Sequence, residues 1–70
     1  MKVSYNKLWK MLIDRNMTKA ELRQKTNIAP STFSRMNKNE VVSLEVFMRI
    51  CLELQCGLDD VVEFTKNENE

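Results

Sequence analysis

The sequence predicts an all-α domain, and three observations support this prediction. The 70 residues include one glycine and one proline, so few positions interrupt a helix. Runs of β-branched residues are short, which disfavours strands. Apolar residues recur at helical spacing, as in Tyr5, Leu8 and Leu12. A chain of this length forms one small domain that buries about 60% of the surface exposed when it is unfolded.

The first two predicted helices are defined by the residues at their ends. The first spans residues 5–15, with Ser4 as its N-cap and Asn16 in a left-handed conformation after its end. The second spans residues 18–26. Its opening threonine and Glu21, three residues later, form the sequence pattern of a capping box.

The third predicted helix, residues 30–37, has two different faces. Asn27 turns the chain before it, and a proline occupies its first position, where a missing amide proton has no cost. Phe33 and Met36 share a face with Ala29, and we expect this face to pack inward. The opposite face carries two hydroxyls and two cations, from Ser31, Ser34, Arg35 and Lys38.

Two further helices complete the prediction. The fourth spans residues 44–54, is capped by Ser43 and is ended by Gly57. Its core stripe is expected to hold Phe47, Ile50, Cys51 and Leu54. A short fifth helix follows, with two aspartates, at 59 and 60, in its first turn, where the helix dipole favours anions. An alternative, which we do not adopt, pairs Lys2–Tyr5 with Val61–Phe64 as two short strands.

The charges are unevenly distributed although the formal net charge is only +1. Residues 1–40 hold nine lysines and arginines against three acids, whereas residues 41–70 hold two against seven. Such a dipolar domain can present a basic face to a polyanion. The alternative is ordinary solvated charge on the surfaces of helices.

The composition argues against an enzyme. The chain has no histidine, which removes the commonest general base and the commonest metal ligand, and it has no glycine-rich phosphate loop. Cys51 and Cys56 alone cannot supply a four-ligand zinc site. We expect both thiols to be reduced, with Cys51 as a small core residue. No cofactor and no metal are predicted.

Hydropathy indicates a cytoplasmic protein that has no membrane partner. No stretch approaches the roughly 20 apolar residues that span a bilayer. The first seven residues, MKVSYNK, lack the apolar run of a signal peptide.

Residues 18–36, which read TKAELRQKTNIAPSTFSRM, resemble the helix-turn-helix of the phage Cro and repressor family, also called the XRE family. The similarity extends from about Leu8 to Val62. The internal apolar positions of the family are matched by Ala20, Leu22, Ile28, Phe33 and Met36. The resemblance implies a compact five-helix domain over residues 1–64, with its second and third helices forming the helix-turn-helix. Residues 65–70 are predicted to form a polar, disordered tail.

The resemblance also implies a function. Members of this family place the third helix in the major groove and commonly bind paired half-sites as dimers. We therefore expect a sequence-specific transcriptional regulator of bacterial or phage type, a repressor, that binds double-stranded DNA as a homodimer. The expected base-facing residues are Pro30, Ser31, Thr32, Ser34 and Arg35. The expected phosphate-binding residues are Thr18, Lys19, Arg23, Lys38 and Asn39.

Two of these positions affect how the protein is expected to bind DNA. Lys19 lies in the first turn of its helix, where the dipole disfavours a cation unless an anion such as a DNA phosphate binds there. Pro30 replaces the base-reading glutamine that family members often carry, so direct readout depends mainly on Ser31 and Arg35.

Some alternatives stay open at the level of sequence. The chain also suits a helical protein-interaction module, such as an antitoxin or an anti-repressor, and a small effector is not excluded. A dimer interface is expected at Met48 and Leu52, or at Phe64. The alternative is that these side chains complete the core of their own domain.

Overall fold

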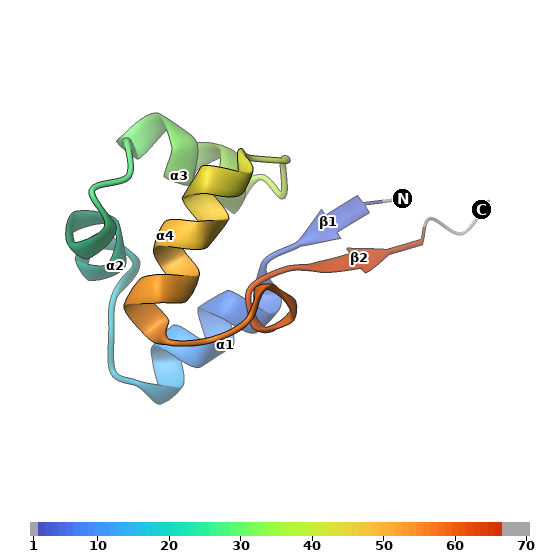
Figure 1. Ribbon diagram of the computed structural model, residues 1–70. Helices are drawn as coiled ribbons and strands as arrows, with labels where there is room; N and C mark the ends of the chain where they lie inside the picture. The colour runs from blue at the N-terminus through green and yellow to red at the C-terminus, as the bar shows by residue number, and fades with distance from the viewer. Residues whose placement is uncertain (1, 67–70) are drawn as a thin grey trace.

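The computed structural model describes residues 2–66 and is mostly helical (Figure 1). Within these residues there are four α-helices, one 3-10 turn and a small sheet of two strands. In chain order the elements are β1 (Lys2–Ser4), α1 (Asn6–Asp14), α2 (Lys19–Thr26), α3 (Pro30–Asn37), α4 (Leu44–Leu54), η1 (Leu58–Asp60) and β2 (Glu63–Thr65).

The prediction of five helices without strands is wrong near the two ends of the described chain. The expected fifth helix is reduced to the single 3-10 turn η1. β1 and β2 pair antiparallel, with Val3 opposite Phe64, close to the alternative that the sequence offered. Thr65, which we assigned to the polar tail, lies in β2. Strands of three residues carry too short an alternation to be recognised locally, so their pairing depends on tertiary context. Residues 67–70 of the expected tail lie outside the described residues.

The core is formed by the inward faces of the four α-helices together with the segments that join the strands to them. The buried apolar residues are Tyr5, Leu8, Leu12, Leu22, Ile28, Phe33, Met36, Val42, Ile50, Leu54, Val61 and Val62. α4 crosses the middle of the molecule and packs against α2 (Figure 1). Phe47 and Cys51 of the predicted stripe are half-buried and pack against this core. Ala20 and Ala29, both expected to face inward, are exposed.

The predicted helix starts are confirmed for α2, α3 and α4. Thr18 and Glu21 form the capping box, a proline opens α3, and the Ser43 side chain accepts from the backbone of the fourth helix. At α1 the N-cap position is held by Tyr5, one residue later than predicted. The Ser4 hydroxyl still accepts a hydrogen bond from the amide of Asn6, at 3.3 Å.

All four α-helices end in the same way. A residue with positive φ follows each helix, and the amide after it donates to the carbonyl five positions earlier, as in the Schellman motif. These amide-to-carbonyl pairs are Met17 to Leu12, Ile28 to Arg23, Glu40 to Arg35 and Cys56 to Cys51. The left-handed residues are Asn16, Asn27, Asn39 and Gln55.

The end of α4 differs from the sequence prediction. Gln55, with a φ of 53°, terminates the helix, whereas Gly57 has a φ of −90° and precedes η1. Glycine is the usual residue at such a left-handed position, so its presence two residues later was misleading.

Candidate nucleic-acid interface

The turn between α2 and α3 is held by three hydrogen bonds, two to carbonyls of α2 and one from α4. The Thr26 hydroxyl donates to the Leu22 carbonyl at 2.7 Å, and the Ile28 amide donates to the Arg23 carbonyl at 3.2 Å. From α4, Arg49 Nη1 donates to the carbonyl of Asn27 at 3.3 Å. These bonds fix the direction in which α3 leaves the turn, and therefore which of its side chains lie outside.

The predicted base-facing residues lie on the accessible side of α3. Pro30, Ser31, Ser34 and Arg35 are exposed and Thr32 is half-buried, while Phe33 and Met36 anchor the opposite face in the core. The predicted inward face is confirmed at Phe33 and Met36, whereas Ala29, expected on the same face, is exposed.

A shallow groove of about 220 Å³ runs between α2 and α3. It brings together two of the predicted base-facing residues, Pro30 and Ser34, with two of the predicted phosphate-binding residues, Lys19 and Arg23. The exposed Ala20 also lines it, and its small side chain leaves the groove open.

Lys19 is held in place at the edge of this groove. Its Nζ donates to Oδ1 of Asn37 at 2.9 Å and lies 4.1 Å from the centre of the Trp9 ring, a cation–π geometry. Trp9 in turn packs against Phe33, with ring centroids 6.1 Å apart. Contacts from α1 and α3 therefore orient a cation at the first turn of α2. Sequence analysis missed both Trp9 and Asn37. The spacing of Trp9, four residues after Tyr5, was the available signal for the aromatic ring.

Arg35 is directed toward the loop between α3 and α4. Its Nη2 donates to the Val41 carbonyl at 2.9 Å, and its Nε lies 3.5 Å from Oε1 of Glu40. Both charged side chains are about half exposed, at 58% and 50%. The outward face of α3, on which only hydroxyls and cations were expected, therefore has an acid beside Arg35, its main candidate for reading a base. Sequence analysis missed Glu40 because the left-handed Asn39 brings it back toward α3.

Tyr5 holds the same loop through a side-chain hydrogen bond. Its buried hydroxyl donates to the Glu40 carbonyl at 2.6 Å. Burial raises the pKa of Tyr5, and the nearby Arg35 guanidinium opposes that shift. The loop is thus attached both to Tyr5, the N-cap of α1, and to the Arg35 guanidinium.

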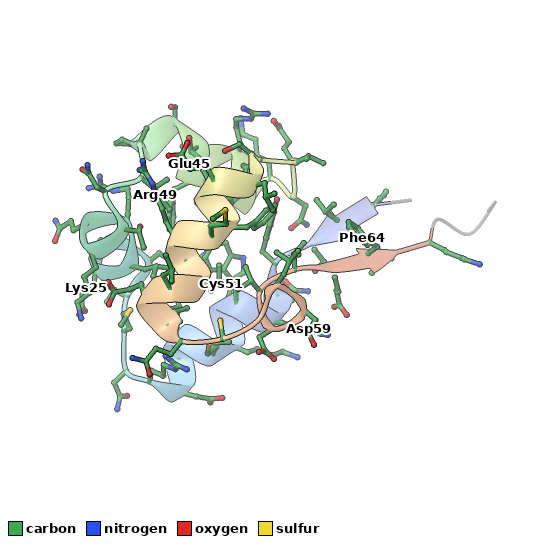
Figure 2. All side chains as sticks on the ribbon, in the orientation of Figure 1. Lys25, Glu45, Arg49, Cys51, Asp59 and Phe64 are labelled. Atoms are coloured by element: carbon green, nitrogen blue, oxygen red, sulfur yellow. The ribbon has the colours of Figure 1, made fainter. Side chains whose placement is uncertain are left out.

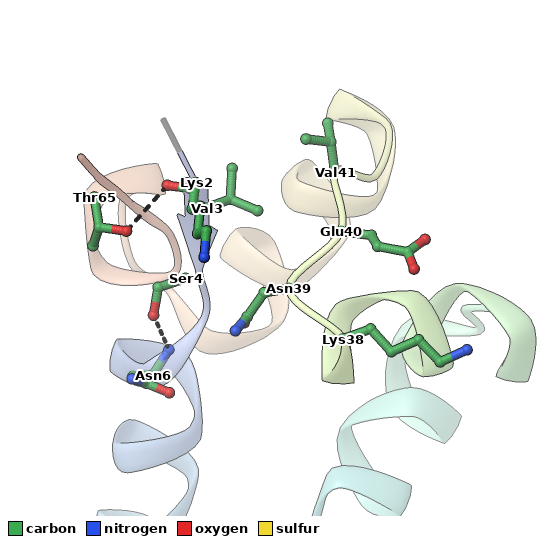
Figure 3. A pocket seen from close by; sticks show the side chains of 9 residues that line it. All are labelled: Lys2, Val3, Ser4, Asn6, Lys38, Asn39, Glu40, Val41 and Thr65. Atoms are coloured by element: carbon green, nitrogen blue, oxygen red, sulfur yellow. Dashed lines mark hydrogen bonds between the residues drawn. The ribbon is translucent and has the colours of Figure 1, made fainter. Parts of the chain in front are cut away.

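The remaining predicted phosphate-binding residues do not share one surface. Thr18 is exposed, and its hydroxyl is engaged in the capping box, accepting from the Glu21 amide at 3.1 Å. Lys38 and Asn39 both line a cleft of about 710 Å³ beside β1. Figure 3 shows the Asn39 amide turned toward β1, whereas the Lys38 chain extends away from it.

Two negative observations apply to residues 2–66. No helix there is long and apolar enough to cross a membrane. No three side chains among histidine, cysteine, aspartate and glutamate in that range are grouped so that they could hold a metal ion.

The helix-turn-helix geometry agrees with the comparisons with known proteins. A family model for the Cro/C1-type HTH DNA-binding domain matches residues 7–67, so the chain belongs to this family. The resemblance inferred from residues 18–36 is confirmed. A similar solved structure is the crystal structure of transcriptional regulator VanUg, Form II. It is 50% identical, with 94% of this chain and 88% of that chain covered and a TM-score of 0.91. No curated protein matches the chain.

Proposed function

We propose that this protein is a sequence-specific transcriptional regulator, a repressor, that binds double-stranded DNA with α3 in the major groove. The observation that carries the proposal is the groove between α2 and α3, where hydroxyl and cationic side chains lie on one exposed face of a Cro/C1-type domain. The similarity to a transcriptional regulator supports the regulatory role.

In this proposal the two helices have different tasks. Lys19, in the first turn of α2, and Arg23, in its last turn, bind phosphates, which fixes the register of the protein on the duplex. Ser31, Ser34 and Arg35 contact base edges, and Arg35 suits the two acceptors of a guanine. To reach a base, Arg35 exchanges its contacts with Glu40 and the Val41 carbonyl for contacts with DNA.

We further propose that the protein binds DNA as a homodimer. The three side chains expected from the sequence to form a dimer interface do not complete the core of the described domain. Met48, Leu52 and Phe64 are 57%, 77% and 68% exposed. Phe64 lies beside an apolar hollow of about 210 Å³, which the exposed side chains of Val41 and Leu44 also line. An exposed aromatic beside an apolar hollow suits a self-complementary contact with a second copy.

Sedimentation of the full chain tests the dimer, with and without DNA. Phe64→Glu is expected to shift the protein toward monomer, whereas Ile13→Glu, at an equally exposed apolar residue of α1, is expected to have no effect. If Leu52→Glu alone disrupts the dimer, the interface lies on α4 instead. A wild-type monomer at high micromolar concentration, even on operator DNA, contradicts the dimer.

Fluorescence anisotropy tests the DNA-binding function. The protein is titrated into labelled mixed-sequence duplex at several salt concentrations, starting at about 50 mM. It is then titrated into a duplex selected from random sequence. Lys19→Glu is expected to weaken binding strongly. Lys25→Glu makes the same charge change on α2, away from the groove residues, and is the matched control. No binding at low salt would overturn the proposal and favour a protein-interaction module that keeps the helix-turn-helix as a scaffold.

A further inference from the structure

The two cysteines of this chain meet at the C-terminal end of α4. Gln55 adopts the left-handed conformation there, and the amide of Cys56 donates back to the carbonyl of Cys51 at 3.1 Å. In a Schellman ending, the residue four positions before the left-handed residue and the residue directly after it frequently have their side chains in contact. In α4 these two positions are both cysteines.

The ending of α3 shows that this backbone geometry can bring the equivalent side chains into contact. At α3 the equivalent positions are Arg35 and Glu40, whose side chains form an ion pair at 3.5 Å. At α4 the Cys51 thiol lies close enough to Cys56 to raise the pKa of that thiol. Both cysteines are free and half-buried, so each combines access to solvent with a fixed position. Figure 2 shows Cys51 on α4, near the η1 turn.

We propose that Cys51 and Cys56 form a modification site that a low-molecular-mass disulfide oxidises reversibly to an intramolecular disulfide. One cysteine loses its proton to solvent, and its thiolate attacks a sulfur of the small disulfide. This forms a mixed disulfide and releases one small thiolate. The second cysteine, also deprotonated, attacks the protein sulfur of that mixed disulfide and releases the second small thiol. Two protein thiols are oxidised and one small disulfide is reduced to two thiols.

The surroundings of the pair determine how the reaction depends on pH. Burial raises the pKa of Cys56. The neighbouring Cys51 and Asp60, in η1, raise it further, while Arg15, after α1, lowers it. Arg15 is fixed in that place because its Nη1 donates to the Leu54 carbonyl at 2.8 Å. Because the thiolate is the attacking species, we expect the rate to increase from neutral toward alkaline pH.

The proposal goes beyond DNA binding, and its test needs no DNA. The reduced full chain is incubated with glutathione disulfide, quenched with acid and measured by intact mass and on a non-reducing gel. The wild type is expected to lose two hydrogens, to carry no glutathione, to remain monomeric on the gel and to recover its mass with dithiothreitol. The oxidised chain is also expected to unfold at a higher temperature, because the bond restricts the unfolded state.

The matched control keeps two thiols but has both within α4, too far apart to form a disulfide. In the double variant Cys56→Ser, Glu45→Cys, the thiols are six residues apart, which is about 9 Å along the axis and beyond the reach of a disulfide. This variant is expected to accumulate glutathione adducts. Adducts or intermolecular dimers at the same level in the wild type would overturn the proposal. So would a wild type that stays reduced while the control reacts.

Discussion

Replacing Glu40 with glutamine should tighten binding to operator DNA while slightly lowering the stability of the free protein. The carboxylate of Glu40 lies 3.5 Å from Nε of Arg35, the side chain that we propose reads a base. Glutamine keeps the length of the side chain and a hydrogen-bond acceptor but removes the charge. The bond from Arg35 Nη2 to the Val41 carbonyl, at 2.9 Å, is not altered by the substitution. The variant therefore removes one of the two contacts that hold the guanidinium away from DNA.

The size of the effect follows from the exposure of the pair. With the two side chains 58% and 50% exposed, the ion pair is worth about 0.2–1 kcal/mol. The free protein should lose that amount in its free energy of unfolding. The complex does not contain this contact, so the same energy appears as tighter binding, by about 1.4- to 5-fold. The two effects have opposite signs, so loss of folded protein cannot imitate the gain in affinity.

Fluorescence anisotropy on a selected operator and on a scrambled duplex, at one salt concentration, measures the difference. Glu45→Gln is the matched control. It removes the same charge from another exposed ion pair, with Arg49 at 2.9 Å, that does not involve Arg35. The gain for Glu40→Gln should exceed that of the control and should be larger on the operator. Equal gains for both variants would refute the release of Arg35 and indicate a general effect of charge. Weaker binding would show that Glu40 orients Arg35 for recognition.

Three further predictions concern single side chains. Lys19→Gln should weaken binding to every duplex and lower the slope of log affinity against log salt by about one, measured by anisotropy over a salt series. Tyr5→Phe should lower the free energy of unfolding in urea by about 1–2 kcal/mol, because it leaves the loop carbonyl without its buried partner. Burial raises the pKa of Tyr5 above its ordinary value of 10.0, so its stabilising effect is complete below that pH and is lost as pH rises through the raised pKa. The alkaline loss of stability should therefore be smaller in the phenylalanine variant. Gln55→Gly should raise the melting temperature and increase the free energy of unfolding by about 0.5–1 kcal/mol, because glycine adopts the left-handed conformation without strain. Asn27→Gly should raise the melting temperature less, because asparagine already tolerates that conformation.

The sequence predicted best the features that depend on neighbouring residues. The capping box at Thr18 and Glu21 and the proline that opens α3 require only a few adjacent positions, and all are as expected. The left-handed conformations of Asn16 and Asn27 were predicted for the same reason. Asparagine tolerates positive φ through its short polar side chain, so the signal lies within the residue itself. Local chemistry therefore predicted where α2 and α3 begin and how α2 ends, whereas the resemblance of residues 18–36 to the Cro and repressor family identified the two helices as a helix-turn-helix.

Features that depend on distant parts of the chain were missed. The sheet joins residues about sixty positions apart, and its pairing was offered from the sequence only as an alternative that was not adopted, because three-residue strands carry little local signal. The cation–π contact of Lys19 requires Trp9 from α1, and its hydrogen bond requires Asn37 from α3. The candidate interface was therefore predicted as a set of side chains, whereas the contacts that orient them before DNA binds depend on the tertiary fold.

The repeated helix ending explains why three unlike contacts occur in one small domain. Each left-handed residue returns the chain to the last turn of the helix before it, so residues five positions apart are brought close together. After α1 the pair is apolar, because Leu12 lies in the core and Met17 packs against the core. After α3 it is an ion pair that involves a proposed base-reading arginine, and after α4 it is two thiols. The same backbone ending therefore holds pairs of different chemistry, and what each helix end can do depends on the two residues that the sequence places there.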